Sequence, residues 1–159
     1  MPKRIFFIGH RNAPASLFPV LSDAIVRHAF LSENVELIIG QYGAFDRMAA
    51  KSALQLKKHR PSLHLTLLCP YHPSFRKIEL PVGFDSLYYP FDRSIPPRAA
   101  IVAANIHMIE TCDVLLFYVA HPGKSRDFLD YAKKTAQKKV LIIENLADTY
   151  IDHTSILRV

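Results

Sequence analysis

The segment from Gly40 to Asp46 has the residue spacing most typical of ligand chemistry in this chain. Gly40 and Gly43 lie between an apolar run and a helical pattern, and glycine lets a ligand approach the backbone closely. Free amides at the start of a helix favour an anion such as phosphate. The segment therefore predicts a phosphate-binding turn that includes Tyr42. Asp46 is placed to bond a ribose hydroxyl or to act on a sugar carbon, as the candidate catalytic residue. The structural alternative is a tight turn with a capping aspartate.

A second candidate group, Gly9-His10-Arg11, follows the first apolar run of the chain. The guanidinium of Arg11 has the geometry that pairs with two phosphate oxygens, and His10 is a candidate proton donor. Gly9 leaves room for a ligand over the end of the preceding strand. The alternative interpretation is a surface arginine beside an ordinary loop histidine.

Two further groups belong to the predicted ligand-binding site. A helix that opens at Pro96-Pro97 has a predicted buried stripe of Ile101, Val102, Met108 and Ile109. Asn105 falls on the same stripe, and Arg98 lies one or two turns earlier on that side. A buried asparagine needs hydrogen-bond partners, which are either neighbouring loop backbone or the ligand. Gly123 and Ser125 follow the strongest apolar run of the chain and complete the predicted site.

Several motifs of well-known chemistries do not occur in the sequence. The G-x-G-x-x-G and G-x-x-x-x-G-K-[ST] patterns are missing, which disfavours a conventional NAD enzyme and a P-loop ATPase. A serine hydrolase would need a G-x-S-x-G elbow. The eight histidines are scattered, and neither cysteine sits in a C-x-x-C pair. We therefore expect no metal site and no resident cofactor.

Short apolar runs alternate with amphipathic helical stretches along the chain. Unbroken apolar strands alternating with helices are typical of a parallel sheet covered on both faces. The sequence therefore predicts an α/β fold, a doubly wound, Rossmann-like open and mostly parallel sheet of five to six strands with helices on both faces. In such a sheet, ligands bind at the carboxyl ends of the strands, near the switch in strand order. The expected strands are residues 5–8, 35–39, 64–69, 86–89, 114–119 and 140–143, and the expected helices are 16–31 with Ser16 as its cap, 45–56, 97–111 and 125–137.

Length and composition predict a single domain over residues 1–159, in which residues 145–159 form a weakly patterned C-terminal tail. Half of the 159 residues are apolar, which suffices for one buried core. No apolar run approaches the roughly 20 residues of a membrane span. The apolar run after Lys3-Arg4 is too short for a signal peptide. A cytoplasmic protein that has no membrane partner is therefore expected.

The net charge of +6 is concentrated in one segment. Seven Lys or Arg residues and no Asp or Glu lie between Arg47 and Lys77, whereas the rest of the chain is close to neutral. Such a segment attracts a phosphate-bearing ligand or a nucleic acid. The alternative is the solvated face of one helix followed by a basic loop.

Taken together, these motifs resemble the SLOG superfamily of Rossmann-like nucleotide-binding proteins, in particular its small bacterial single-domain branch. The superfamily includes the cytokinin-activating LOG phosphoribohydrolases, also called lysine decarboxylase-like proteins, and the DNA-processing DprA/Smf family. The resemblance covers about residues 4–145. The matching residues are Gly9-His10-Arg11, then Gly40, Gly43 and Asp46, then Asn105, Met108, Asp113 and the strand 114–119, and finally Tyr131-Ala132-Lys133.

The sequence departs from the family pattern at three places. Ala104 stands where the branch usually carries an arginine before the helix asparagine. The glycine-rich stretch that many relatives carry is reduced to Pro122-Gly123-Lys124-Ser125. The LOG motif P-G-G-x-G-T-x-x-E is missing, so its catalytic glutamate has no counterpart here. Relatives often self-associate, and a homodimer is compatible with the resemblance.

Three functions follow from these observations. The leading hypothesis is binding of a nucleotide or nucleotide-derived small molecule, with phosphate on the amides of Gly40 to Gly43 and on Arg11, and with Asp46 or Asn105 on ribose hydroxyls. The second is cleavage of an N-glycosidic bond in a nucleoside monophosphate by Asp46. The third is nucleic-acid binding through the basic segment Arg47–Lys77, which ranks last because its helix lacks the interleaved aromatics of a stacking surface.

Overall fold

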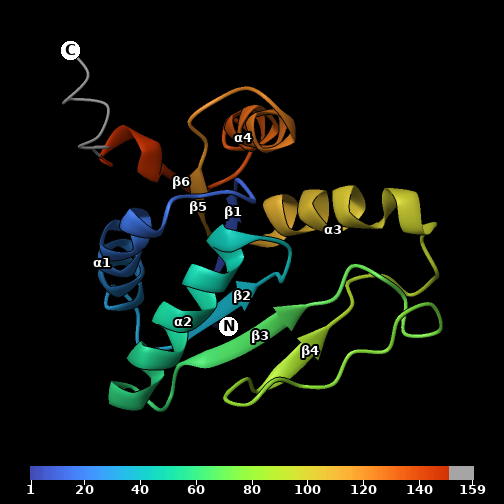
Figure 1. Cartoon of the computed structure of the whole chain (residues 1–159), viewed down its shortest axis with the longest axis horizontal. Helices are drawn as coiled ribbons and strands as arrows, with labels where there is room; N and C mark the ends of the chain where they lie inside the picture. The colour runs from blue at the N-terminus through green and yellow to red at the C-terminus, as the bar shows by residue number, and fades with distance from the viewer. Residues whose placement is uncertain (151–159) are drawn as a thin grey trace.

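Six parallel strands form one sheet in the order β4-β3-β2-β1-β5-β6, and helices cover both of its faces (Figure 1). The computed structural model describes residues 1–150. The predicted doubly wound, Rossmann-like α/β fold is confirmed. The strands are β1 (Lys3–Gly9), β2 (Val35–Ile39), β3 (His64–Leu68), β4 (Ser86–Tyr88), β5 (Val114–Tyr118) and β6 (Ile142–Asn145). The helices are α1 (Phe18–Ala29), α2 (Ala44–His59), α3 (Pro97–Thr111) and α4 (Lys124–Thr135), with 3-10 turns η1 (Ala15–Leu17) and η2 (Leu146–Asp148).

Alternating side chains of the central strand β1 contribute to two halves of the core. Ile5 and Phe7 pack with α1 and α2 on one face of the sheet. Phe6 and Ile8 pack with α3 and α4 on the other face. The neighbouring strand β5 is buried along its whole length. Its unbroken apolar run therefore reflects cover on both sides, as the sequence pattern predicted.

The order of the strands reverses between β1 and β5. The chain moves outward from β1 to β4 and then returns to β5 on the opposite side of β1 (Figure 1). Gly9 at the end of β1 pairs with Tyr118 at the end of β5. The loops that follow these two strands lead to opposite faces of the sheet, which opens a crevice at their carboxyl ends.

Two local predictions for the helices are wrong. Ser16 does not cap α1, because its hydroxyl lies 2.5 Å from the hydroxyl of Tyr150 and α1 begins after η1 without a side-chain cap. On α3, the buried residues are Ala100, Ala104, Met108 and Ile109. The sequence pattern had placed Ile101 and Val102 there. This helix is apolar on nearly every side, so its periodicity did not identify the inner face.

The end of the described chain is more ordered than the predicted tail of residues 145–159. Asn145 belongs to β6, and η2 buries Leu146 against the core on the α1 and α2 face. The rest of that predicted tail, residues 151–159, lies outside the described residues. Within residues 1–150, no helix has both the length and the apolarity to cross a membrane.

An irregular segment, residues 69–85, connects β3 to β4. At its end, the carboxylate of Asp85 accepts hydrogen bonds from the backbone N–H of Leu65 at 2.9 Å and from the Lys57 ammonium at 2.8 Å. Both bonds lower the pKa of Asp85, and the bond from the Leu65 amide has the larger effect. Asp85 therefore fixes the point at which the segment rejoins the sheet.

Replacing Asp85 by alanine tests this anchoring role. We expect Asp85→Ala to lower the free energy of unfolding at pH 7 by about 1 to 2 kcal/mol, because two charge-assisted hydrogen bonds are lost. A lowered pKa contributes stability above the ordinary value of 3.8 that is lost as the pH falls through the folded-state value. In urea unfolding, the difference from wild type should therefore shrink below pH 4. Asp92→Ala, at an exposed position, is the control. An equal effect of both substitutions would contradict the role of Asp85.

Candidate functional site

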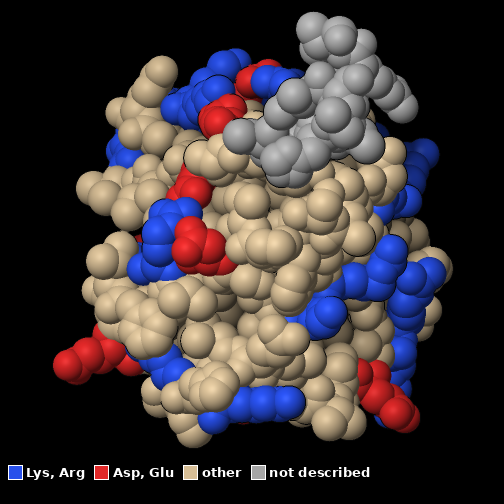
Figure 2. Space-filling model, turned by 60° about the vertical axis from the view of Figure 1, so that its left-hand side comes forward, with Lys and Arg blue, Asp and Glu red and all other residues tan. Residues whose placement is uncertain are grey.

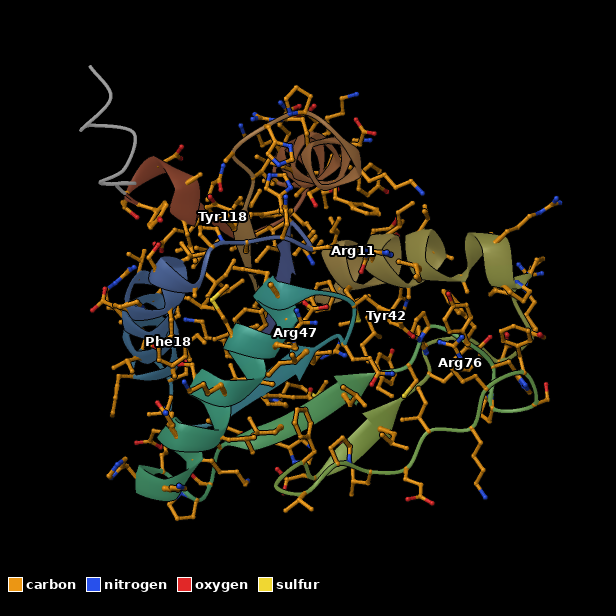
Figure 3. The ribbon with its side chains drawn as sticks, in the orientation of Figure 1. Arg11, Phe18, Tyr42, Arg47, Arg76 and Tyr118 are labelled. Carbon is orange, nitrogen blue, oxygen red and sulfur yellow. The ribbon has the colours of Figure 1, made fainter. Side chains whose placement is uncertain are left out.

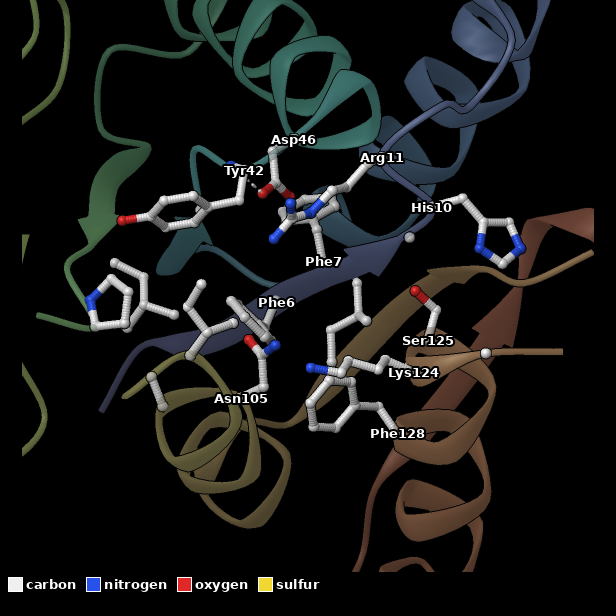
Figure 4. A pocket seen from close by; sticks show the side chains of 18 of the residues that line it. Phe6, Phe7, His10, Arg11, Tyr42, Asp46, Asn105, Lys124, Ser125 and Phe128 are labelled. Carbon is white, nitrogen blue, oxygen red and sulfur yellow. Dashed lines mark hydrogen bonds between the residues drawn. The ribbon is translucent and has the colours of Figure 1, made fainter. Parts of the chain in front are cut away.

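A pocket of about 270 Å³ opens at the carboxyl ends of β1, β2, β3 and β5, where the strand order reverses (Figure 4). It extends from the loops that follow these strands to the sheet surface between α3 and α4. All predicted ligand-binding residues except Gly43 and Arg98 line it. The lining residues are Phe6 to Asn12, Gly40, Tyr42, Asp46, Leu68, Pro70, Ile101, Ala104, Asn105, His121 to Ser125 and Phe128.

The turn after β2 already contains an anion, the carboxylate of Asp46. Its Oδ2 atom accepts a hydrogen bond from the backbone N–H of Tyr42 at 3.0 Å. A Cβ atom at Gly40 would lie 2.8 Å from the same oxygen. A side chain at Gly40 would thus displace the carboxylate from its place against the Cα atom of this glycine. A side chain of the protein, rather than a ligand, makes the close approach that the sequence predicted.

Gly43 serves the packing of two loops. It has a φ of 138°, and a Cβ atom there would lie 2.6 Å from the Cα atom of Arg11. The next amide, of Ala44, donates to the carbonyl of Arg11 at 2.8 Å. Asp46 thus engages one of the amides to which the sequence assigned a phosphate, that of Tyr42, and the Arg11 carbonyl engages the next amide after the turn, that of Ala44.

The carboxyl of Asp46 lies in the pocket wall beside the guanidinium of Arg11 (Figure 4). Burial raises its pKa from 3.8 to about 6, and the Tyr42 N–H bond and the charges of Arg47 and Arg11 oppose this increase only in part. A carboxyl that titrates near neutral pH can accept or donate a proton at a bound ligand. The sequence-based role of Asp46 as the candidate catalytic residue stays a prediction.

His10 lines the pocket and also holds the loop after β5. Its Nε2 atom accepts hydrogen bonds from the backbone N–H groups of Ala120 at 2.9 Å and His121 at 3.4 Å. Its ring also stacks on that of His121 at a centroid distance of 3.7 Å. Burial, followed by the charges of His121 and Arg126, lowers the pKa of His10. These contacts give His10 a positioning role in this loop, and its role as a proton donor stays a prediction.

Gly9 also has a packing role, since a Cβ atom there would lie 2.4 Å from the ring of Phe45 on α2. The room that the sequence assigned to a ligand is used on this side by Phe45. The backbone of Gly9 nevertheless lines the pocket, together with Arg11 and Asn12.

The opposite wall of the pocket comes from α3 and from the start of α4. Asn105, Lys124 and Ser125 direct their side chains into the pocket, and Phe128 lies beside them (Figure 4). Gly123, with a φ of 141° and open space around it, lets the chain turn from β5 into α4. Lys124 is the cation that the sequence-based site did not include. The sequence signal that could have identified Lys124 is its position directly after Gly123, in the loop that follows the apolar run 114–119.

Arg98 is exposed in the first turn of α3 and does not reach the pocket. The basic segment Arg47–Lys77 does not form one surface either. Lys57 and Arg60 make internal contacts, the latter with the carbonyls of Ala29, Ser32 and Glu33. Figure 3 shows Arg47 on α2 and Arg76 far out on the segment after β3. In Figure 2, Lys and Arg form several separate groups on the visible face.

The cysteines and the metal-binding side chains do not form a second centre. Cys69 and Cys112 are buried, and each is free of a disulfide bond. Burial raises the pKa of both thiols, that of Cys112 to about 12. Within residues 1–150, no cluster of three or more His, Cys, Asp or Glu side chains could hold a metal ion.

Comparison with solved structures places this geometry among known folds. The X-ray structure of DNA processing protein A (DprA) from Streptococcus pneumoniae matches 85% of this chain with a TM-score of 0.61 and 14% identity. The chain has a DprA-like fold. DprA from Helicobacter pylori, described for its single-stranded DNA binding mode, matches 99% of the chain with a TM-score of 0.55 and 18% identity.

The chain spans about half of the Streptococcus pneumoniae DprA chain, 48%, and 72% of that from Helicobacter pylori. No family model and no curated protein sequence matches it. These likenesses confirm the predicted Rossmann-like α/β fold, and the resemblance of the motifs to the SLOG superfamily stays a prediction.

Asp46→Asn tests the state of the pocket carboxyl. A raised pKa means that the ionised form destabilises the folded protein, and this penalty develops as the pH rises from about 4 to about 7. One pKa unit corresponds to about 1.4 kcal/mol, and partial exposure of the side chain reduces the effect. We expect Asp46→Asn to raise the free energy of unfolding by about 1 to 2 kcal/mol at pH 7.5 and by nothing measurable at pH 4.

Urea unfolding at pH 4, 5.5 and 7.5 measures this difference. Asp127→Asn is the matched control, because Asp127 occupies the exposed first turn of the neighbouring helix α4. If the difference in free energy of unfolding between wild type and Asp46→Asn does not change with pH, the pKa of Asp46 is not raised in the folded protein.

Proposed function

We propose that this chain binds a nucleotide or a nucleotide-derived ligand at the carboxyl ends of its strands. The observation that carries the proposal is the convergence of Arg11, Lys124, Ser125 and Asp46 on one pocket (Figure 4). Two cations and a hydroxyl suit a phosphate, and a carboxylate suits the hydroxyls of ribose. A pocket with mostly apolar walls and a few convergent polar groups is typical of small-molecule sites.

The phosphate subsite is proposed between Arg11 and Lys124, in place of the turn that Asp46 occupies. Both side chains are exposed at the rim of the pocket; Arg11 lies in the loop after β1, and Lys124 is the first residue of α4, which follows the adjacent strand β5. The side chain of Ser125, in the first turn of α4, makes no hydrogen bond within residues 1–150, so its hydroxyl can donate to the same anion. Positive charge from two sides supports binding of a dianion.

The ribose is proposed to lie against Asp46. The Oδ2 atom of this carboxylate is held by Tyr42, whereas Oδ1 accepts no hydrogen bond from the described residues. A ribose hydroxyl can donate to Oδ1 while Arg11 neutralises the charge. The sequence assigned this role to Asp46 as well, so the proposal keeps the residue and moves only the phosphate.

The enzymatic alternative, cleavage of the N-glycosidic bond, receives less support. Among the described residues that line the pocket, Asp46 is the only acidic one. No second carboxyl group among these residues can serve as general acid or base, and His10, a further proton carrier, is engaged with the β5–α4 loop. Release of free base from a bound nucleotide, abolished by Asp46→Asn, is the observation that would favour turnover.

Substitution of the two cations tests the phosphate subsite. We expect Arg11→Ala and Lys124→Ala each to weaken binding of AMP by roughly 10- to 100-fold, the loss typical of one charge-assisted hydrogen bond. Isothermal titration calorimetry with AMP and ribose 5-phosphate measures both affinities. Alanine keeps the Cβ atom of Arg11 that packs near Gly43, so the loop is preserved.

Arg98→Ala is the control for net charge, because Arg98 is an exposed arginine outside the pocket. It should bind AMP as the wild type does. Unchanged affinity in both Arg11→Ala and Lys124→Ala would refute the phosphate subsite. An equal loss of AMP affinity in Arg98→Ala would show that the effect of the other two substitutions comes from the net charge and not from a phosphate subsite.

A second candidate function, binding of single-stranded nucleic acid, is favoured by a row of aromatic rings beside the pocket. The ring of Tyr42 meets that of Tyr71 at 6.1 Å, and Tyr71 meets Phe75 at 5.5 Å. The guanidinium of Arg76 lies 4.7 Å above Tyr71. Rings interleaved with cations form stacking platforms for single strands. The fold resembles that of a DprA described for its single-stranded DNA binding mode.

Variants of this aromatic row separate the two functions. We expect Phe75→Ala and Arg76→Ala to weaken binding of an oligothymidylate by roughly 5- to 50-fold, because stacking contributes about 1 to 3 kcal/mol per base, and to leave AMP affinity within twofold. Fluorescence anisotropy at 50 and 200 mM salt measures the strand affinity and its salt dependence. Lys58→Ala, exposed on α2, is the control. Strand binding that survives both substitutions would exclude the aromatic row as the platform.

A further inference from the structure

The pocket has a polar half and an apolar half. The polar half lies under the loops that carry Arg11, Asp46 and Lys124. The apolar half lies over the sheet between α3 and α4, where one carboxamide, that of Asn105, interrupts the apolar lining (Figure 4). The apolar lining residues there are Phe6, Leu68, Ile101, Ala104 and Phe128.

The carboxamide of Asn105 makes no hydrogen bond to any of residues 1–150, although the residue is half-buried. Its side-chain atoms are not among the fully buried unpaired polar atoms, and the residue lines the pocket, so the carboxamide is open to a ligand. The sequence offered neighbouring loop backbone as the partner of this side chain, but no such bond forms. A hydrogen-bond donor and an acceptor therefore face an apolar space that a ligand can fill.

We propose that Asn105 recognises the edge of a nucleobase in the apolar half of the pocket; this rests on the proposed nucleotide function. A carboxamide presents one acceptor and one donor side by side, and asparagine pairs in this way with the adjacent donor and acceptor of adenine. A planar ring fits between apolar and aromatic walls such as Phe6 and Phe128.

The same walls argue against a ribose at Asn105. A sugar would bring several hydroxyl groups against Ile101 and Phe128, where they lose water without finding partners. Asp46 on the opposite wall offers an acceptor for those hydroxyls. The structure thus assigns the sugar to Asp46 and the base to Asn105, whereas the sequence left both residues as candidates for the sugar.

The first experiment compares AMP with ribose 5-phosphate, which lacks the base, by isothermal titration calorimetry on the full chain. We expect wild type to bind AMP at least tenfold more tightly than ribose 5-phosphate. Asn105→Leu, which keeps the approximate volume of the side chain, should weaken AMP binding by about tenfold and leave ribose 5-phosphate within twofold. Thermal unfolding of each variant verifies that it is folded.

Asn105→Asp provides a second variant with a different expected result. It replaces the donor by an acceptor, which opposes the acceptor atom of adenine and suits the two adjacent donors of guanine, N1–H and N2–H. The ratio of GMP affinity to AMP affinity should therefore rise at least tenfold. A residue with a merely structural role would weaken both nucleotides equally and leave that ratio unchanged.

The outcomes distinguish this inference from the proposed function. Equal affinity of wild type for AMP and ribose 5-phosphate would overturn base recognition and leave phosphate binding in place. An equal loss of both ligands in Asn105→Leu, with an unchanged ratio in Asn105→Asp, would also overturn it. Binding of none of AMP, GMP, CMP, UMP and ribose 5-phosphate would refute the proposed function, and base recognition with it.

Discussion

The geometry of the site depends on one contact, the carboxylate of Asp46 held by the Tyr42 amide against Gly40. A turn between a parallel strand and its helix ordinarily offers its amides to an external anion. Here the chain supplies that anion itself. The phosphate subsite is consequently proposed between Arg11, beside Asp46, and the start of α4, and Asp46 forms a wall of the pocket with its pKa raised to about 6.

Hydrogen bonds from two neighbouring segments fix the backbone at the end of β5, which borders the crevice. The side chain of Asn145 on β6 receives the Val119 N–H at 2.9 Å and donates to the Val119 carbonyl at 3.0 Å. His10 accepts the next amide, that of Ala120. Strands on both sides thus position the loop that carries Lys124 and Ser125. Such preorganisation lowers the entropic cost of ordering a loop when a ligand binds.

Much of this arrangement could be predicted because it follows from hydrophobic pattern and strand order. Apolar runs such as Val35–Ile39 located the strands, and the rule for parallel sheets brought the candidate residues together at one edge. The pattern could not show which amides of a turn are already satisfied. That depends on the side-chain conformations of Asp46 and Arg11, which spacing does not determine. Likewise, α3 is apolar on nearly every side, so its pattern left the inner face, and the place of Arg98, undefined.

The pocket concentrates features that oppose folding. Asp46 is a carboxyl whose burial disfavours its charge, Asn105 is a carboxamide without a partner among residues 1–150, and Arg11 and Lys124 bring like charges to one rim. Each feature alone is tolerable, since native proteins are stable by only about 5 to 15 kcal/mol and single defects cost a fraction of that. A single ligand that contacts all of these groups would explain why they occur together in one cavity. A phosphate between the cations, a hydroxyl on Asp46 and a ring edge on Asn105 would do so. The convergence of these groups on one cavity supports the proposal that the pocket binds a ligand.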